Sequence, residues 1–222
     1  AIVMVMFTQA FRFAYEPFIF ARNKDAGDGN KKSYSDAMKY FIIFGLFIFL
    51  AVMFYIDLVR FFMPATYCTG LKVVPIVMLA ELFFGVFFNL SLWYKLTDRT
   101  QWGAWFSLFG FAITAIINIV GVPRFGYMAC AWGAFVCYAS MMLASFFIGQ
   151  RVYPIRYDLK SAFRYTLLTI VLYAVAMVVP IESLFLRLAF RTLLLGVFLV
   201  YLFRHDLSLN EVPGLRRFVS KF

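Results

Sequence analysis

Charged residues, histidine and cysteine are all scarce in this chain of 222 residues. Asp, Glu, Lys and Arg make up 14% of it, whereas soluble domains have about a quarter. There is one histidine, His205, and the three cysteines form no CxxC pair. We therefore expect no zinc or haem site, no other metal and no cofactor. The GxSxG, HExxH, Walker and DxD-type patterns of common enzymes are also absent, so we expect that the protein is not an enzyme.

Apolar residues dominate instead, since 64% of the chain is hydrophobic. A membrane-spanning helix needs about 20 mainly apolar residues, and the chain offers about seven such segments. They lie at about 1–20, 37–59, 72–94, 102–121, 127–149, 161–180 and 184–203. The alternating pattern of membrane strands is absent, and hydrocarbon forces the backbone to hydrogen-bond within each segment. We therefore predict an all-α, polytopic transmembrane helix bundle.

The uneven distribution of basic residues predicts the orientation of this bundle. We expect the transmembrane bundle over residues 1–203 and a basic tail over 204–222. Fifteen of the 21 Lys and Arg residues lie at the end that holds the tail and a hydrophilic loop at 22–35, and four lie at the opposite end. The positive-inside rule then places the tail in the cytoplasm. The net charge of +10 is explained by this orientation and by contact with the lipid bilayer, and we expect no nucleic-acid partner.

Charged residues inside the predicted helices are the most informative for function, because each costs about 2.5–3.5 kcal/mol or more at a helix centre. Arg12 and Glu16 are four residues apart, so they can pair on one face of the first helix. Pro17 follows them and favours a kink or a break. Two interpretations stay open: a charged pair that faces a water-filled cavity, or a structural ion pair near the membrane interface.

Further polar residues lie deep in the predicted helices. Glu81 has no basic residue within one or two turns of its own helix. It is expected to face a cavity, to pair across the bundle with a residue such as Arg12, or to stay protonated. Asn89 and Asn118 are expected to hydrogen-bond between helices. With Arg12 and Glu16, these three residues are our candidates for a substrate or ion cavity.

Two arginines lie on one face at the start of the last predicted helix, four residues apart. Arg187 is close enough to the end of the helix to reach the outer head groups. Arg191 is one turn deeper, and we expect its side chain to extend back toward the interface.

Several short motifs resemble those of a known family. They comprise Phe11-Arg12-Phe13-Ala14-Tyr15-Glu16-Pro17-Phe18 before Ala21-Arg22, Val74-Pro75-Ile76, the stretch 89–98, Asn118-Ile119, the stretch 123–127 and Ala131-Trp132. In these positions the chain is similar to polysaccharide biosynthesis proteins. These are the oligosaccharide-lipid flippases of the multidrug/oligosaccharidyl-lipid/polysaccharide exporter superfamily. The motifs are packing patterns spread over nearly the whole chain and contain no catalytic signature.

The resemblance implies a transporter of fourteen helices in two lobes, of which this chain would be the C-terminal lobe with two additional helices. The chain also begins inside a hydrophobic run and without Met, so we expect an N-terminal lobe to be missing from it. Such proteins move undecaprenyl-diphosphate-linked oligosaccharide across the bacterial inner membrane for polysaccharide or O-antigen biosynthesis, generally coupled to a cation such as H⁺ or Na⁺. The resemblance implies that Arg12 attracts the diphosphate, with Glu16 and Glu81 as its partners or as ion-coupling groups.

Two other classes of function stay open. An integral membrane enzyme of envelope polysaccharide synthesis would need clustered polar residues in a large loop at the membrane face, and no predicted loop exceeds about 15 residues. A non-catalytic assembly subunit would not depend on its intramembrane charges. A drug exporter of the same superfamily is a close variant of the first interpretation.

Overall fold

The computed structural model describes residues 2–25, 30–61, 64, 70–179 and 183–206, and these form helices without any strand. The helices are α1 (Ile2–Asp25), α2 (Asn30–Phe54), α3 (Ile56–Phe61), α4 (Val74–Leu90), α5 (Leu92–Leu96), α6 (Gln101–Phe125), α7 (Tyr127–Val152), α8 (Leu159–Val178) and α9 (Leu184–His205). The predicted all-α class is confirmed. Most of the predicted basic tail, residues 207–222, lies outside the described residues.

Six helical segments of the described chain are long and apolar enough to cross a membrane. They are Lys31–Phe54, Gly70–Leu96, Gln101–Phe125, Tyr127–Val152, Leu159–Val178 and Leu184–His205. A multi-pass membrane protein is therefore supported. Helix α1 has 24 residues but is more polar, because it carries Gln9, Arg12 and Glu16. Six of the predicted spans thus have the length and composition that a spanning helix needs, and the predicted number of about seven is not confirmed.

The helix boundaries differ from the prediction in three places. The hydrophilic loop predicted at 22–35 is wrong, because α1 continues to Asp25 and α2 begins at Asn30; most of these polar residues are acceptable helix formers. The third predicted helix is divided at Ser91 into α4 and α5. A break at Pro17 is also wrong, since α1 runs through this residue. In membranes, neighbouring helices and side chains compensate for the backbone donor that proline removes.

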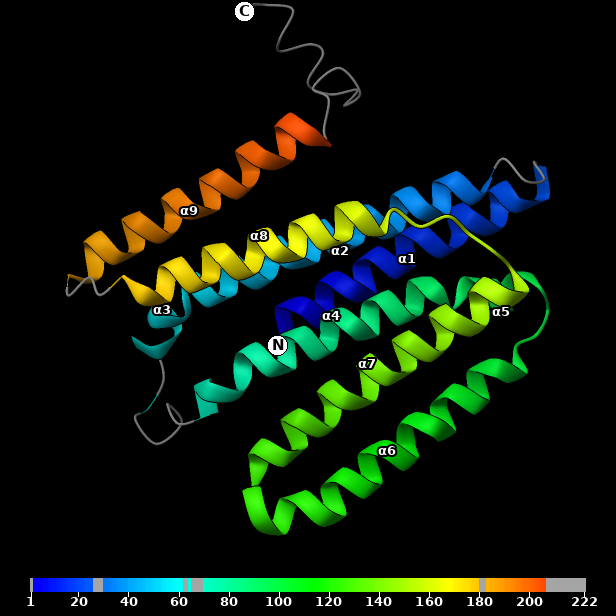
Figure 1. The fold of residues 1–222 in the computed structure, drawn as a ribbon, viewed down its shortest axis with the longest axis horizontal. Coiled ribbons are helices and arrows are strands. Elements are labelled where there is room, and N and C mark those ends of the chain that lie inside the picture. The colour runs from blue at the N-terminus through cyan, green and yellow to red at the C-terminus, as the bar shows by residue number, and fades with distance from the viewer. Residues whose placement is uncertain (1, 26–29, 62–63, 65–69, 180–182, 207–222) are drawn as a thin grey trace, which may run out of the picture.

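The long helices form two groups, as Figure 1 shows. Helix α7 packs between α4 and α6, while α2 packs against α8 and α9. Helix α1 lies against both α2 and α4, and these two helices contact one another. The main core lies around α2 and includes Phe41, Leu50 and Phe198, all of which are fully buried. Helices α1, α2 and α4 therefore join the two groups.

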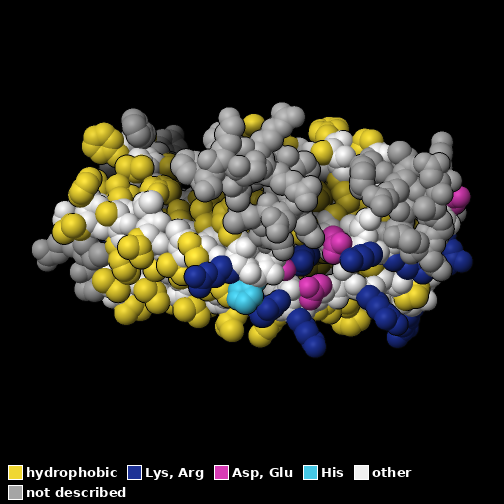
Figure 2. Space-filling view, turned by 90° about the horizontal axis from the view of Figure 1, so that it is seen from above, with side chains coloured by type: hydrophobic (Ala, Val, Ile, Leu, Met, Phe, Trp, Pro, Cys, Tyr) yellow, Lys and Arg dark blue, Asp and Glu magenta, His cyan; other side chains and the backbone are white. Residues whose placement is uncertain are grey.

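Polar contacts hold α9 at the end of the bundle where this helix finishes, which we call the C-terminal end. Asp206 accepts a hydrogen bond from the Lys39 ammonium group of α2, at 2.9 Å, and one from the Tyr165 hydroxyl of α8, at 2.6 Å. Burial alone would raise the pKa of Asp206, but these two hydrogen bonds outweigh it and lower the pKa below its usual value. Basic side chains gather toward this end on the face shown in Figure 2, and apolar side chains cover much of the other half.

Close approach between α4–α5 and α7 depends on a glycine. A Cβ atom at Gly149 would lie 2.7 Å from Cδ1 of Trp93. The Trp93 ring is only 2% exposed, and its Nε1 donates a hydrogen bond to Ser145 Oγ at 3.2 Å. The ring therefore has little freedom to move away.

We predict that Gly149→Ala lowers the stability of the protein by about 1–3 kcal/mol, the usual cost of overpacking a filled core. Gly196→Ala is the matched control, because no atom lies within 4 Å of a Cβ at that position of α9. This control should be neutral or stabilising by up to about 1 kcal/mol. Thermal unfolding of the detergent-purified variants measures both effects. Equal melting temperatures for the two variants would contradict the predicted packing.

Candidate functional site

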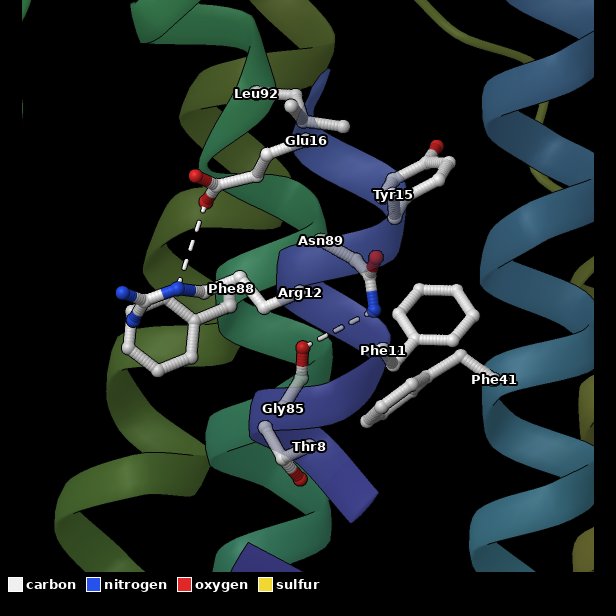
Figure 3. Close-up of a pocket in the computed structure, with 10 residues that line it drawn as sticks. All are labelled: Thr8, Phe11, Arg12, Tyr15, Glu16, Phe41, Gly85, Phe88, Asn89 and Leu92. Carbon is white, nitrogen blue, oxygen red and sulfur yellow. Dashed lines mark hydrogen bonds and ion pairs between the residues drawn. The ribbon is translucent and has the colours of Figure 1, made fainter. Parts of the chain in front are cut away.

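A small pocket lined by polar and aromatic side chains lies where α1, α2 and α4 meet (Figure 3). The structure brings three of the five predicted site residues together here: Arg12 and Glu16 from α1, and Asn89 from α4. Aromatic side chains enclose them, among them Phe41 of α2 and Phe88 of α4. The pocket is therefore a charged site within an otherwise apolar part of the bundle.

Glu16 is the centre of the charged groups. Its Oε1 lies 3.8 Å from Arg12 Nε, so the predicted pair forms. The same oxygen accepts a hydrogen bond from the Lys95 ammonium group of α5 at 2.7 Å. The three side chains are between 27% and 33% exposed. One carboxylate thus faces two cations, and the group carries one unmatched positive charge when all three are ionised.

The guanidinium group of Arg12 is also fixed by an aromatic ring. Its Cζ lies 4.9 Å from the centre of the Phe88 ring, an arrangement that attracts a cation to the ring face. Arg12 therefore does not pair with Glu81, which was one of the expectations for that residue. A planar guanidinium held in this way keeps donors that can bind a phosphate or carboxylate with two parallel hydrogen bonds.

The floor of the pocket is closely packed. A Cβ atom at Gly85 would collide with the Phe41 ring and lie 3.1 Å from Thr8 Oγ1. Thr8 is 2% exposed, and its hydroxyl oxygen has no hydrogen-bond partner among the described residues. The free space is about 10 Å³, near the minimum for one water molecule. In this conformation the pocket holds no larger ligand.

The predicted roles of the two asparagines require correction. Asn89 was expected to bond to another helix, but its amide donates to the Gly85 carbonyl of its own helix at 3.2 Å. Asn118 lies between α6 and α7, where its Oδ1 would be 3.3 Å from a Cβ at Gly133, and this oxygen has no hydrogen-bond partner in the described chain. Asn118 therefore fills the space that Gly133 leaves, whereas Phe41 and Thr8 fill the space at Gly85.

Glu81 lies apart from this pocket, on the same helix. It is four residues before Gly85 and therefore on the same face of α4. It is half-buried, and it forms no hydrogen bond or ion pair with another described side chain. Tyr138 of α7 lies within electrostatic reach of it. Glu81 is thus a second, separate ionisable group within the bundle.

Two polar residues of this region were not among the predicted site residues: Lys95, which pairs with Glu16 beside the pocket, and Thr8, which lines it. Lys95 was counted among the basic residues of the loop after the third predicted helix, and only the short helix α5 turns it toward Glu16. Thr8 is uncharged and was therefore overlooked. It lies four residues before Arg12, so the helix period could have placed both side chains on the same face of α1.

A larger apolar groove lies between the two groups of helices. It holds about 670 Å³ and is lined by side chains of α2, α4, α7 and α8, such as Leu46, Leu82, Phe146 and Ile170. This volume is in the range of small-molecule sites. Tyr157 lines it toward the C-terminal end and Tyr173 toward the opposite end. The groove therefore runs along the bundle and has a polar hydroxyl group near each end.

Comparisons of this chain with protein-family models, with curated proteins and with solved structures give no match. Functional arguments therefore rest on the residues themselves.

We predict that Glu16→Lys destabilises the protein by about 1 kcal/mol, because three cations would then share a partly solvated site. Adding Lys95→Glu should restore most of this loss, since the opposite charges meet again. Thermal unfolding in detergent measures the single and double variants. Arg99→Glu is the control, because Arg99 is exposed near Lys95 and has no described contact with Glu16. Rescue by Arg99→Glu as complete as by Lys95→Glu would contradict the Glu16–Lys95 pair.

Proposed function

We propose that this chain is part of a membrane transporter that flips undecaprenyl-diphosphate-linked oligosaccharide across the bacterial inner membrane for polysaccharide or O-antigen biosynthesis. The observation that carries the proposal is the charged cluster of Arg12, Glu16 and Lys95 at the pocket, which has one unmatched positive charge inside an apolar bundle. Burying such a charge is costly. A substrate that brings negative charge to the site would offset this cost during transport.

The diphosphate group suits this pocket chemically. Arg12 has a planar fork of donors and Lys95 is a point charge, and both are common phosphate-binding groups. Glu16 holds the two cations in place while no substrate is bound. A diphosphate would compete with Glu16 for them, so binding requires the pocket to open from the closed state described above. The proposal therefore includes alternation between a closed and an open pocket.

The lipid part of the substrate suits the apolar groove. Pro75 and Leu90 both line it, and these residues are separated by about 22 Å along a helix, at 1.5 Å per residue. The hydrocarbon core of a bilayer is about 30 Å thick. An isoprenoid chain can lie in such a groove while its head group crosses at a polar site. This combination of a long apolar groove with a charged pocket favours an amphiphile over a small polar solute.

Coupling to a cation is part of the same proposal. Glu81 has no described ion-pair partner and lies on the α4 face that leads to Gly85 and the pocket. A carboxyl group in this position can take up and release H⁺, or bind Na⁺, as the bundle changes conformation. The second lobe and the cytoplasmic location of the C-terminus belong to the proposal through the family resemblance and the positive-inside rule.

The proposal predicts that loss of the full-length protein leaves lipid-linked oligosaccharide on the cytoplasmic leaflet. Complementation with Arg12→Gln should lower the transport rate about tenfold or more, because one charge-assisted contact to the diphosphate is lost. Arg124→Gln is the matched control, since Arg124 is exposed at the far end of α6. Full transport by Arg12→Gln would overturn the role of the pocket. An assembly subunit would tolerate this change, and a membrane enzyme would accumulate an unmodified precursor instead.

The groove gives an independent test. Thr166 lines it and is exposed in the structure, so Thr166→Trp should fill part of the groove without disturbing the core. We expect slower transport with normal membrane insertion. Leu167→Trp changes the next residue of α8, which is exposed but does not line the groove. Equal transport by these two variants would exclude the groove as the path of the lipid chain.

A further inference from the structure

A second group of charged side chains lies at the opposite end of the bundle, where α2 finishes and α9 begins. Arg191 Nη1 donates a hydrogen bond to Asp57 Oδ2 at 2.8 Å and another to the Phe54 carbonyl at 2.9 Å. Arg187 Nε lies 3.2 Å from the same Asp57 oxygen. The side chain of Arg191 is buried against the end of α2, because a carboxylate and the last carbonyl of this helix are within reach. Its expected extension toward the membrane interface stays a prediction.

These three side chains leave an unmatched positive charge and free donors. Two guanidinium groups share one carboxylate, so the cluster carries one net positive charge. Arg191 is only 7% exposed, and its Nε has no hydrogen-bond partner among the described residues. The Nε of Arg187 is likewise buried without a hydrogen bond, although it lies near Asp57. Leaving buried, charged donors unsatisfied is costly. The Arg187 side chain is 33% exposed, so its outer guanidinium donors can reach a ligand that accepts hydrogen bonds.

The helix termini add to this positive potential. Arg187 and Arg191 occupy the first two turns of α9, and no acidic residue lies in the first turn. A helix N-terminus carries partial positive charge, so basic side chains are unfavourable there and an anion is favourable. Arg191 compensates only the opposite, negative terminus of α2, through the Phe54 carbonyl.

The surroundings of this cluster are those of a membrane interface. The short helix α3, which carries Asp57, exposes Leu58, Val59 and Phe61. Tyr173 lies within electrostatic reach of Arg191 and also lines the apolar groove. A molecule that binds the arginines through an oxyanion thus has apolar surface beside it for hydrocarbon chains. These features favour a lipid over a small soluble anion.

We infer that Arg187 and Arg191, positioned by Asp57, bind the phosphoryl group of an anionic lipid at the end of the bundle opposite the C-terminus. The phosphoryl oxygens accept hydrogen bonds from guanidinium donors that Asp57 leaves free. The hydrocarbon chains of the lipid lie against α3 and the groove. The site is separate from the Arg12 pocket, and it does not depend on the transport function proposed above.

Lipid binding to the purified full chain in detergent, measured by native mass spectrometry, tests this inference. The probes are phosphatidylglycerol, zwitterionic phosphatidylcholine and inorganic pyrophosphate. Arg187→Gln should weaken phosphatidylglycerol binding about tenfold, the value of one charge-assisted hydrogen bond. Asp57→Asn should strengthen it, because it removes the competing carboxylate. Arg124→Gln removes an equal charge at the same end of the molecule and should leave binding unchanged.

The opposite effects of the two cluster variants separate a ligand site from a purely structural ion pair. If Asp57→Asn weakens phosphatidylglycerol binding as much as Arg187→Gln does, or if Arg124→Gln weakens it equally, the inference is wrong. Displacement of phosphatidylglycerol by pyrophosphate would show that the phosphoryl group alone is recognised; binding of the lipid without such competition would show that the hydrocarbon chains are also needed. Should Asp57→Asn not fold, Arg187→Lys replaces it and should keep binding within about threefold, since a lysine still binds phosphate as a point charge.

Discussion

A charged side chain inside a membrane is costly unless a counter-charge is within reach, and this constraint explains much of how the helices are joined. Asp206 joins α9 to Lys39 of α2, Asp57 joins the other end of α9 to the end of α2, and Glu16 joins α1 to α5. Each contact links helices that are distant in sequence. Apolar packing between helices is weakly directional in lipid, because the lipid tails are as apolar as the side chains. The ion pairs therefore provide directional contacts between the helices.

The same constraint decides what could be predicted from the sequence. The apolar segments predicted the long helices correctly, because a backbone in hydrocarbon must satisfy its hydrogen bonds within the segment. The pair of Arg12 and Glu16 was also predictable, since four-residue spacing is a local property of a helix. The contacts of Glu16 with Lys95 and of Asp57 with Arg191 were not, because each depends on which helices are neighbours. Nor could the apolar groove be predicted, as its lining comes from four separate helices whose residues look like ordinary membrane-facing positions.

The arrangement of the helices also separates rigid from adaptable regions. Helices α4, α6 and α7 pack closely through glycines and a filled aromatic cluster around Trp93. Helices α2, α8 and α9 form the other group, and α9 is fixed at both ends by charged contacts. Between α7 and α8 lies the groove, which has few contacts across it. A change in the separation of the two groups of helices would therefore change the width of the groove first. It would also change the pocket where α1, α2 and α4 meet.

Both charged clusters share one property that a purely structural ion pair does not need. In each, one carboxylate is set against two cations, although a matched pair would cost less in a low-dielectric environment. The clusters lie toward opposite ends of the bundle, and the groove extends between α2, α4, α7 and α8 along its length. Excess positive charge near both ends, with an apolar path between, is a distribution that suits binding of anionic amphiphiles at either end. An enzyme acting at one membrane face would need such a site at that face alone.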